Sequence, residues 1–331
     1  MVDKEAHPFR IGVTSGSLDR VTSAAGRSQG DRREDLARAF TEQRPRLVSL
    51  AYRLSGSVAD AEDAVQEAWI RLQRADADPA TAPVDVPAWL TTTTTRIALD
   101  QLRSAGRRKE TYVGPWLPEP RLGQGVGPAP APRPDDAAAL ADELSFAVMV
   151  VLEALTPPQR AAFILHDTFG VPFEEIAHVL GRTPAAVRQL ASRAREQVAS
   201  GVRRERPDGA THRRTLEAFL AASAGGDLQS LVEVLDPSVV YRADGGGLVR
   251  TALNVVSGPD KVARLVLGVL RRTGSDVDMS VRTVNGAPGL VFTRGETLVG
   301  VVALDVTVEG RVAAIDVLMN PEKLARLTVG A

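Results

Sequence analysis

The most informative absence in this sequence of 331 residues is cysteine, which does not occur at all. Disulfide bridges, zinc sites with thiolate ligands and a cysteine nucleophile are therefore excluded. Only four histidines occur, and they lie too far apart in the sequence for metal-ligand spacing. No apolar run approaches the roughly 20 residues that a helix needs to cross a bilayer, and the N-terminus lacks the apolar segment of a signal peptide. We expect a cytoplasmic protein with no metal, no other cofactor and no membrane partner.

The chain also lacks a net charge of either sign, since its formal charge is only −1. A uniformly basic surface for nucleic acid is therefore not expected, although local basic patches remain compatible with this balance. Apolar residues make up 44% of the sequence, which is enough to form packed cores. A chain of this length predicts two or three domains.

Composition and periodicity divide the chain into six parts. Residues 1–33 are rich in Gly, Ser, Thr and Arg without a period and are predicted to be a disordered leader. Residues 34–111 and 137–200 carry apolar residues at helical spacing. The Pro/Gly-rich segment 112–136 is predicted to be a linker, and residues 201–210 form a second, short one. Residues 211–331 have helical segments followed by alternating strands, which predicts an α+β domain.

Within the C-terminal part, the expected helices lie at about 212–224, 227–235 and 259–272. Val-rich alternating segments predict strands at 239–242, 248–256, 277–285, 288–294, 296–308 and 311–318.

The most specific local pattern is a helix-turn-helix over residues 173–190. Gly181 stands where a tight turn needs positive φ, and Thr183 followed by Pro184 predicts the cap and first residue of a new helix. The second helix of such a unit enters the major groove. Arg and Gln there contact guanine and adenine edges, whereas an arginine at the turn suits phosphate. The candidate DNA-contacting residues are Arg182, Arg188, Gln189, Ser192 and Arg193. The alternative is an ordinary surface helix with solvated arginines.

A second basic element is predicted on the helix at about 87–108, whose C-terminal end carries several arginines. They suit both a phosphate backbone and the helix dipole, so the dipole alone remains an alternative explanation. Five consecutive threonines, 91–95, are predicted to turn their hydroxyls toward a nucleic-acid strand. The candidate residues of this face are Arg96, Asp100, Arg103 and Arg107.

The helix predicted at 60–73 is acidic on one face and therefore does not bind DNA. Its acidic and amide residues are Glu62, Asp63, Gln66 and Glu67. We interpret them as a docking surface for a basic protein, with a merely solvated face as the alternative. Trp116 is a large apolar side chain in a Pro-rich segment, and we expect it to dock on a neighbouring domain.

Together, these elements resemble an extracytoplasmic-function sigma factor. The resemblance rests on the segment from Ala61 to Trp69, on Ala88-Trp89-Leu90, on the segment from Ala98 to Arg103, and on the helix-turn-helix. It implies core RNA polymerase and promoter DNA as partners. It also implies that the acidic helix faces polymerase, that the arginines of the 87–108 helix lie near the −10 element, and that the helix-turn-helix reads the −35 element. Two weak modules on one tether gain avidity when both sites are engaged.

A narrower resemblance is to the sigma J group, whose members carry a SnoaL-like C-terminal extension. The linker has the group's Trp-Leu-Pro-Glu-Pro sequence, and the C-terminus has a similar Asn320-Pro321-Glu322-Lys323-Leu324. The group's Asp-Gly-Gly-Gly-Lys sequence appears here with Leu248 in place of the lysine. The resemblance implies that the extension regulates the sigma modules in cis. The implied interdomain residues are Trp116, Leu117, Pro118, Glu119, Pro120, Asp244, Gly245, Gly246 and Gly247.

We therefore predict a multidomain protein: two all-α sigma modules, the second with a helix-turn-helix, and an α+β SnoaL-like cone domain. It is not expected to be an enzyme. One alternative is a ligand-sensing helix-turn-helix regulator, which binds DNA as a dimer. Another is a cone-fold enzyme with Asp244, Asp305, Asp316 or Tyr241 as acid-base groups. A small ligand of the cone also remains open.

Overall fold

The computed structural model describes residues 29–78, 80–109, 112–125, 145–201 and 207–327. The chain divides after Gln43 into a short N-terminal unit and a large unit. Helix α1 (Gln29–Ser55) begins within the predicted leader, before the boundary predicted at residue 34. Residues 1–28 of that leader lie outside the described residues. No helix in the described parts of the chain is long and apolar enough to cross a membrane.

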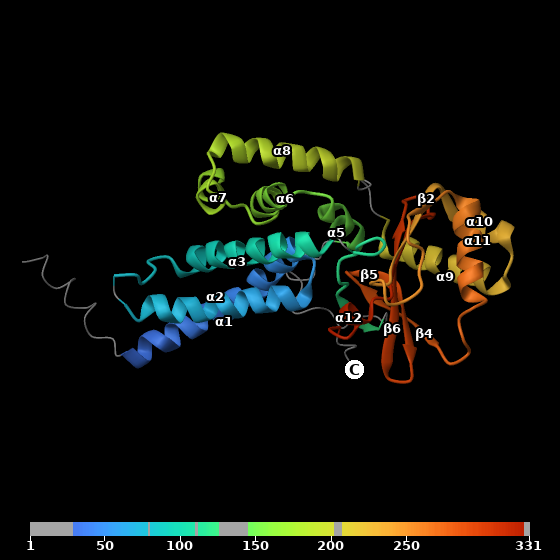
Figure 1. Ribbon diagram of the computed structural model, residues 1–331, viewed down its shortest axis with the longest axis horizontal. Helices are drawn as coiled ribbons and strands as arrows, with labels where there is room; N and C mark the ends of the chain where they lie inside the picture. The colour runs from blue at the N-terminus through green and yellow to red at the C-terminus, as the bar shows by residue number, and fades with distance from the viewer. Residues whose placement is uncertain (1–28, 79, 110–111, 126–144, 202–206, 328–331) are drawn as a thin grey trace, which may run out of the picture. The chain divides into compact units, whose positions relative to one another are not determined.

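The first helical module contains α1, α2 (Val58–Asp76) and α3 (Val86–Lys109) (Figure 1). Helix α1 ends at a glycine because Gly56 adopts φ +73°, a left-handed conformation that favours a residue without Cβ. Helix α2 then begins at Ser57, whose Oγ accepts a hydrogen bond from the Asp60 amide at 3.2 Å. This is an N-cap that satisfies one unpaired amide of the first turn. The turn between the two helices is therefore fixed by local chemistry.

The second helical module contains α5 (Phe146–Glu153), α6 (Pro157–Phe163), the π-helical turn η2 (Ile164–Thr168), α7 (Phe173–Leu180) and α8 (Pro184–Gly201). Pro157 and Pro184 stand at the starts of their helices, where a missing amide hydrogen costs nothing. Helices occupy most of the region predicted to be helical from Phe146 onward, and residues 137–144 lie outside the described part.

The linker contains a strand that its Pro/Gly composition did not predict. Strand β1 (Leu122–Gly125) pairs antiparallel with β4 (Asp278–Val284), with Leu122 opposite Val284. The linker thereby becomes the edge of the C-terminal sheet. Such pairing depends on a strand that lies far away in the sequence.

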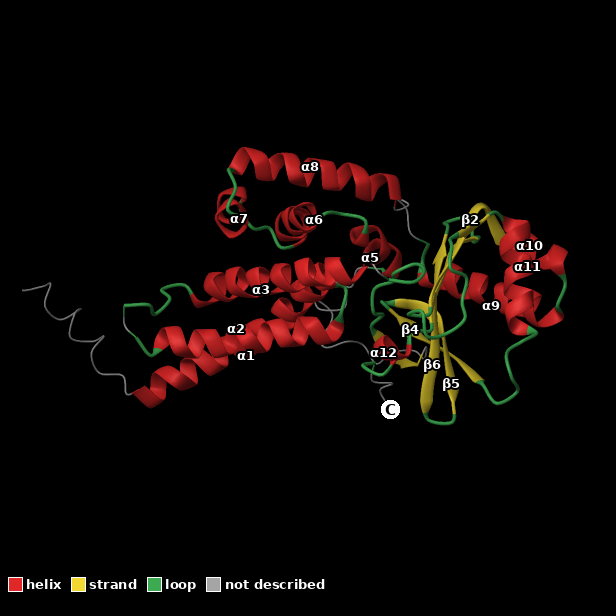
Figure 2. Ribbon diagram, in the orientation of Figure 1, coloured by secondary structure: helices red, strands yellow, loops and turns green. Residues whose placement is uncertain are grey.

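The C-terminal domain is α+β, as predicted, with helices and one sheet (Figure 2). Its remaining elements are α9 (Gly209–Gly225), α10 (Leu228–Val234), β2 (Leu235–Asp244), β3 (Val256–Ser257), α11 (Pro259–Leu270), β5 (Ala287–Arg294), β6 (Thr297–Val306), β7 (Val312–Leu318) and α12 (Pro321–Leu324). Among the described residues, seven strands are ordered β1-β4-β5-β6-β7-β2-β3. Strands β2 and β7 pair in parallel and the other neighbours pair antiparallel.

The strand predicted at 248–256 is wrong except for its last residue, Val256. The preceding glycines turn the chain, since Gly246 and Gly247 adopt φ +67° and +73°. Leu248 and Leu253 then lie exposed in a loop rather than in a ladder. The alternating apolar residues suggested a strand, but no neighbouring strand pairs with most of this segment.

Two apolar cores lie on the sheet. One core joins α9, α10 and α11 to strands β2, β5, β6 and β7. The other contains Val284, Val291, Val301 and Leu318 of the sheet. It also contains Leu117 of the linker, Phe146 of α5 and Leu324 of α12. The second core therefore joins the linker, the second helical module and the C-terminal domain.

Two glycines in different surroundings predict opposite effects of substitution by alanine on stability. A Cβ at Gly246 lies 2.6 Å from the Asn320 side chain, and φ is +67°. We expect Gly246→Ala to lower the free energy of unfolding by about 1–3 kcal/mol. Gly268 lies in α11 with open space around its Cβ position, so Gly268→Ala should raise the stability by about 0.5–1 kcal/mol. Urea unfolding of both variants provides the test, and equal stability of Gly246→Ala and the parent would contradict the strain argument.

Candidate functional site

The helix-turn-helix has the geometry that the sequence predicts. Gly181 ends α7 with φ +62°, and the Thr183 hydroxyl accepts a hydrogen bond from the Ala186 amide at 3.3 Å. The buried residues on the facing sides are Ile176 and Ala177 of α7 and Val187, Ala191 and Ala194 of α8. The opposite side of α8 is left facing solvent.

The five residues predicted to contact −35 DNA are all exposed: Arg182, Arg188, Gln189, Ser192 and Arg193. Arg188 donates to the Glu174 carboxylate at 2.9 Å and lies 5.4 Å above the Phe173 ring. This surface ion pair contributes little to stability. The guanidinium is therefore held against α7 by a solvent-exposed ion pair.

On α3, the residues predicted to lie near −10 DNA are exposed where they are described. Arg103 pairs with Asp100 at 2.9 Å, and the side chain of Arg107 lies outside the described part. Arg96 donates to the main-chain carbonyl of His178 at 3.5 Å. Since His178 belongs to α7, one residue of the predicted −10 face contacts the helix-turn-helix module.

The prediction that the threonine hydroxyls of α3 face a nucleic acid is wrong for at least three of the five. Thr94 and Thr95 are buried. Thr91 and Thr95 donate to carbonyls one turn earlier, Pro87 at 2.9 Å and Thr91 at 2.7 Å. Hydroxyls in a helix commonly satisfy themselves in this way.

The acidic face of α2 is exposed at Glu62, Asp63 and Gln66. Glu67 is half-buried and accepts from Arg71 at 2.8 Å. The buried side of the same helix consists of small and apolar residues. The acidic face thus presents its carboxylates to solvent without a role in the module's core.

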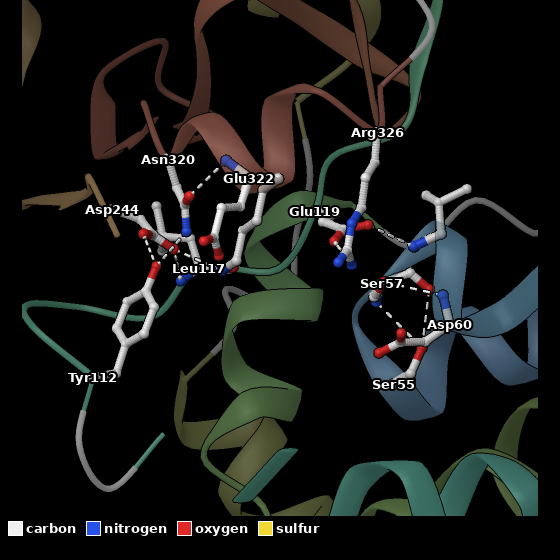
Figure 3. A network of polar contacts seen from close by, with 12 residues as sticks. Ser55, Ser57, Asp60, Tyr112, Leu117, Glu119, Asp244, Asn320, Glu322 and Arg326 are labelled. Carbon is white, nitrogen blue, oxygen red and sulfur yellow. Dashed lines mark hydrogen bonds and ion pairs between the residues drawn. The ribbon is translucent and has the colours of Figure 1, made fainter. Parts of the chain in front are cut away.

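The linker meets the C-terminal domain around the carboxylate of Asp244, at the end of β2 (Figure 3). We call this group of contacts the Asp244 junction. Asp244 is 0% exposed. Its Oδ2 accepts from the Leu117 amide at 3.0 Å and from Lys323 Nζ at 2.7 Å. Its Oδ1 accepts from the Gly246 amide at 3.1 Å and from the Tyr112 hydroxyl. All these donors stabilise a carboxylate that has left water.

Lys323 completes the Asp244 junction from α12 and is only 5% exposed. Its ammonium also donates to the Leu117 carbonyl at 2.6 Å and lies 3.4 Å from the centroid of the Trp116 ring. Burial lowers the pKa of Lys323, and the Asp244 carboxylate opposes this shift. Trp116 thus packs on a residue of the C-terminal domain, as expected of a tryptophan in a Pro-rich segment.

Sequence reasoning singled out Asp244 and Trp116 but gave no role to three further residues of this junction. These are Tyr112, whose hydroxyl accepts from Asn320 Nδ2 at 2.8 Å, Asn320 itself, and Lys323. The position of the missing motif lysine, Leu248, is 65% exposed and lies outside the junction. The cation beside Asp244 instead comes from 79 residues further along the chain, so spacing alone did not reveal it.

The other end of the linker segment binds the turn between α1 and α2. The Glu119 amide donates to the Gly56 carbonyl at 2.8 Å, and its carboxylate accepts from the Val58 amide at 2.9 Å. The Glu119 carbonyl accepts from the Tyr52 hydroxyl at 2.7 Å, which in turn accepts from Asn285 Nδ2 at 3.1 Å. The short linker segment therefore bonds to the first module and to the C-terminal domain at once (Figure 3).

Two acid-base candidates of the C-terminal domain, Asp244 and Asp316, are engaged in structural contacts. Asp316 is buried and accepts two bonds from Arg242, at 2.6 and 3.0 Å. Burial raises the pKa of Asp316, and Arg242 opposes the rise. Burial raises the pKa of Tyr241 to about 12. In the described parts of the chain, no group of acidic or histidine side chains is arranged to hold a metal ion.

The buried ion pair of the Asp244 junction yields a double-mutant prediction. Lys323→Met leaves a fully buried carboxylate without its cation, and we expect a loss of about 3–5 kcal/mol in unfolding free energy. Adding Asp244→Asn removes the stranded charge, so the double variant should lose less than the sum of the two single losses. Exposed Lys261 in α11 provides the control, and Lys261→Met should change little. Additive losses in denaturant unfolding would show that the two residues are not coupled.

Comparison with known proteins gives consistent matches. The family model for sigma-70 region 2 matches residues 39–108, and that for sigma-70 region 4 matches residues 145–198. The chain is 44% identical over 294 residues to the ECF RNA polymerase sigma factor SigJ of Mycobacterium tuberculosis, covering 86% of this chain and 91% of that protein. It is 34% identical to a probable ECF sigma factor, SigI, of the same species, over 88% of this chain and 95% of that protein. The crystal structure of M. tuberculosis SigJ superposes with a TM-score of 0.68 at 39% identity, covering 89% of this chain and 99% of that one.

Proposed function

The chain belongs to the family of ECF RNA polymerase sigma factors, and on this premise we propose that it directs core RNA polymerase to promoters with −35 and −10 elements. The order of its modules supports this role: a region 2 module, a linker and a region 4 module with a helix-turn-helix. The alternative of a conventional dimeric regulator is not favoured, because a region 2 module has no part in it. Core polymerase works in the cytoplasm, and we place the protein there.

The exposed residues divide naturally between two DNA elements. The face of α8 with Arg188 and Gln189 would enter the −35 major groove, where these side chain types form bidentate contacts worth about 1–3 kcal/mol of discrimination each. The face of α3 with Arg96, Asp100 and Arg103 would lie along the −10 element. The exposed acidic residues of α2 would face polymerase, since they take no part in the core of their own module.

We further propose that the C-terminal domain regulates the sigma modules in cis. The observation that carries this proposal is the linker segment, which is bonded to the buried carboxylate of Asp244 and to the turn after α1. Arg96 supports it, because this candidate −10 contact is bonded to the region 4 carbonyl of His178. The two modules must separate before both faces engage DNA. A linker held by the C-terminal domain opposes that separation.

We assign no catalytic step to the C-terminal domain, because two of its buried carboxylates already hold cations. Asp244 is paired with Lys323 and Asp316 with Arg242. Breaking either pair would leave an uncompensated charge in the interior. These contacts support a structural and regulatory role.

The test of this function is transcription in vitro with core polymerase on a library of −35/−10 promoters. The full-length chain is compared with a truncation that ends at Gly209, before most of α9. Promoter-specific transcripts from either form support a sigma factor, and we expect a different yield from the truncated form. Equal yields would contradict regulation in cis. Absence of transcripts from both forms, with DNA binding retained, would contradict the sigma function.

The acidic face of α2 predicts a separation of polymerase binding from DNA binding. Reversing Glu62, Asp63 and Glu67 to lysine should lower binding to core polymerase and promoter transcripts at least tenfold, because charge complementarity at an interface is lost. Binding of the protein to a −35 DNA fragment should not fall. The matched control reverses three exposed acids of the C-terminal domain, Glu217, Glu233 and Asp260. A similar loss in the control would show that the effect is general rather than local to α2.

A further inference from the structure

Arg160 of α6 is a buried arginine that is not among the residues proposed to contact DNA or polymerase. It is 1% exposed. Its Nη1 donates to the Glu153 carboxylate at 2.9 Å and to the main-chain carbonyl of Leu54 at 2.9 Å. Glu153 ends α5 in the same module, but Leu54 lies in the last turn of α1, in the region 2 module. Arg160 is therefore a direct bond between the two sigma modules.

The Leu54 carbonyl needs such a partner because the helix ends there. In a continuing helix this carbonyl would accept from the amide four residues later, which is the amide of Val58. That amide instead donates to Glu119 of the linker at 2.9 Å. The two backbone groups separated by the end of α1 are thus satisfied by two different segments, the carbonyl by Arg160 and the amide by Glu119.

Gly56, between these two groups, permits the approach of region 4. A Cβ at this position would lie 2.5 Å from the Glu153 carboxylate, and φ is +73°. In the turn Leu54–Val58, the Leu54 carbonyl and the Gly56 Cα therefore face the buried Arg160–Glu153 pair. The Val58 amide faces the linker. A helix C-terminus also favours a cation energetically.

We propose that Arg160 is a latch, a bond that holds regions 2 and 4 together independently of the C-terminal domain. It is a second restraint in addition to the Asp244 junction. This inference rests on the proposed regulation in cis, since it concerns the same closed arrangement. It predicts that release of the Asp244 junction alone leaves the sigma modules joined. Separation requires that Arg160 also leaves the end of α1, so a signal acting on the C-terminal domain is necessary but insufficient for opening.

The competing role for Arg160 is purely internal, as the partner of Glu153 within region 4. Replacing both charges by apolar side chains distinguishes the two roles. The combined substitution Arg160→Met and Glu153→Leu keeps the interior of region 4 filled and leaves no stranded charge. It removes the bond to Leu54. With the Asp244 junction released by Asp244→Asn, an internal role predicts that the pair causes no further change in the separation of the modules, whereas a latch predicts opening.

The absence of cysteine makes the full chain suited to a distance measurement. Fluorescent donor and acceptor dyes are attached at Gln73→Cys on α2 and Ala199→Cys on α8, both exposed positions. Single-molecule energy transfer then gives the ratio of open to closed molecules. The backgrounds are the parent, Asp244→Asn, the Arg160→Met/Glu153→Leu pair, and all three substitutions together. The control pair, Arg195→Met with Asp167→Leu, removes an ion pair of the same module near its surface.

We expect the triple variant to raise the open-to-closed ratio at least tenfold above that of Asp244→Asn, the order expected for a lost hydrogen bond to a charged group. The control pair should leave the ratio unchanged. Circular dichroism checks that each variant is folded, and Arg160→Lys, which keeps a cation near Glu153, replaces the apolar pair if that pair does not fold.

The latch is refuted if the triple variant and Asp244→Asn have the same ratio and that ratio is raised above the parent's, and cis regulation then stands without it. Because no polymerase is present, this outcome is distinct from failure of the sigma function, which is measured by promoter transcripts. An unchanged ratio in every background would overturn the latch together with the proposed cis regulation.

Discussion

The arrangement depends on one carboxylate. Asp244 is inaccessible to water, and a buried ionised group persists only if it is paired and hydrogen-bonded. Its partners come from widely separated parts of the chain: Tyr112 and Leu117 from the linker, Gly246 from the next turn, and Lys323 from the C-terminal helix. If one partner is removed, the buried carboxylate of Asp244 is no longer fully paired, and the remaining contacts become less stable. The contacts therefore form and break together. This coupling explains how a linker that is rich in proline and glycine acquires a defined path.

The proposed regulation in cis depends on the path of the linker. Leu117 lies in an apolar core with sheet residues and with Phe146 of region 4, and two residues further along the linker Glu119 bonds to the turn after α1. Burial raises the pKa of Glu119, since the carboxylate loses water on entering this turn. A domain that holds the linker thereby holds both modules, while the α8 residues proposed to read the −35 element stay exposed. Packed interfaces of this kind tend to have two states rather than a continuum.

The sequence was informative wherever a structural feature depends on neighbouring residues. The helix-turn-helix was predicted from Gly181, Thr183 and Pro184, because caps and turns are set within a few residues. The Thr91 and Thr95 hydroxyls are an exception and were misjudged, although the helix carbonyls that they bond lie only four residues earlier. Strand β1 and the role of Lys323 were missed because each depends on a partner far away in the sequence. The failed strand at 248–256 has the same cause, since alternation alone does not show whether a neighbouring strand exists.

We propose that the linker is bound to Asp244 in the free protein and leaves it when the factor joins polymerase. Amide hydrogen exchange at Leu117 measures this directly, because its N–H donates to Asp244. The amide of Val262, which bonds within the C-terminal domain to the Gly258 carbonyl, serves as the internal reference. We predict that the Leu117 amide is protected in the free chain and exchanges at least tenfold faster in the complex with core polymerase, while Val262 is unchanged. Equal protection of Leu117 in both states would contradict the claim.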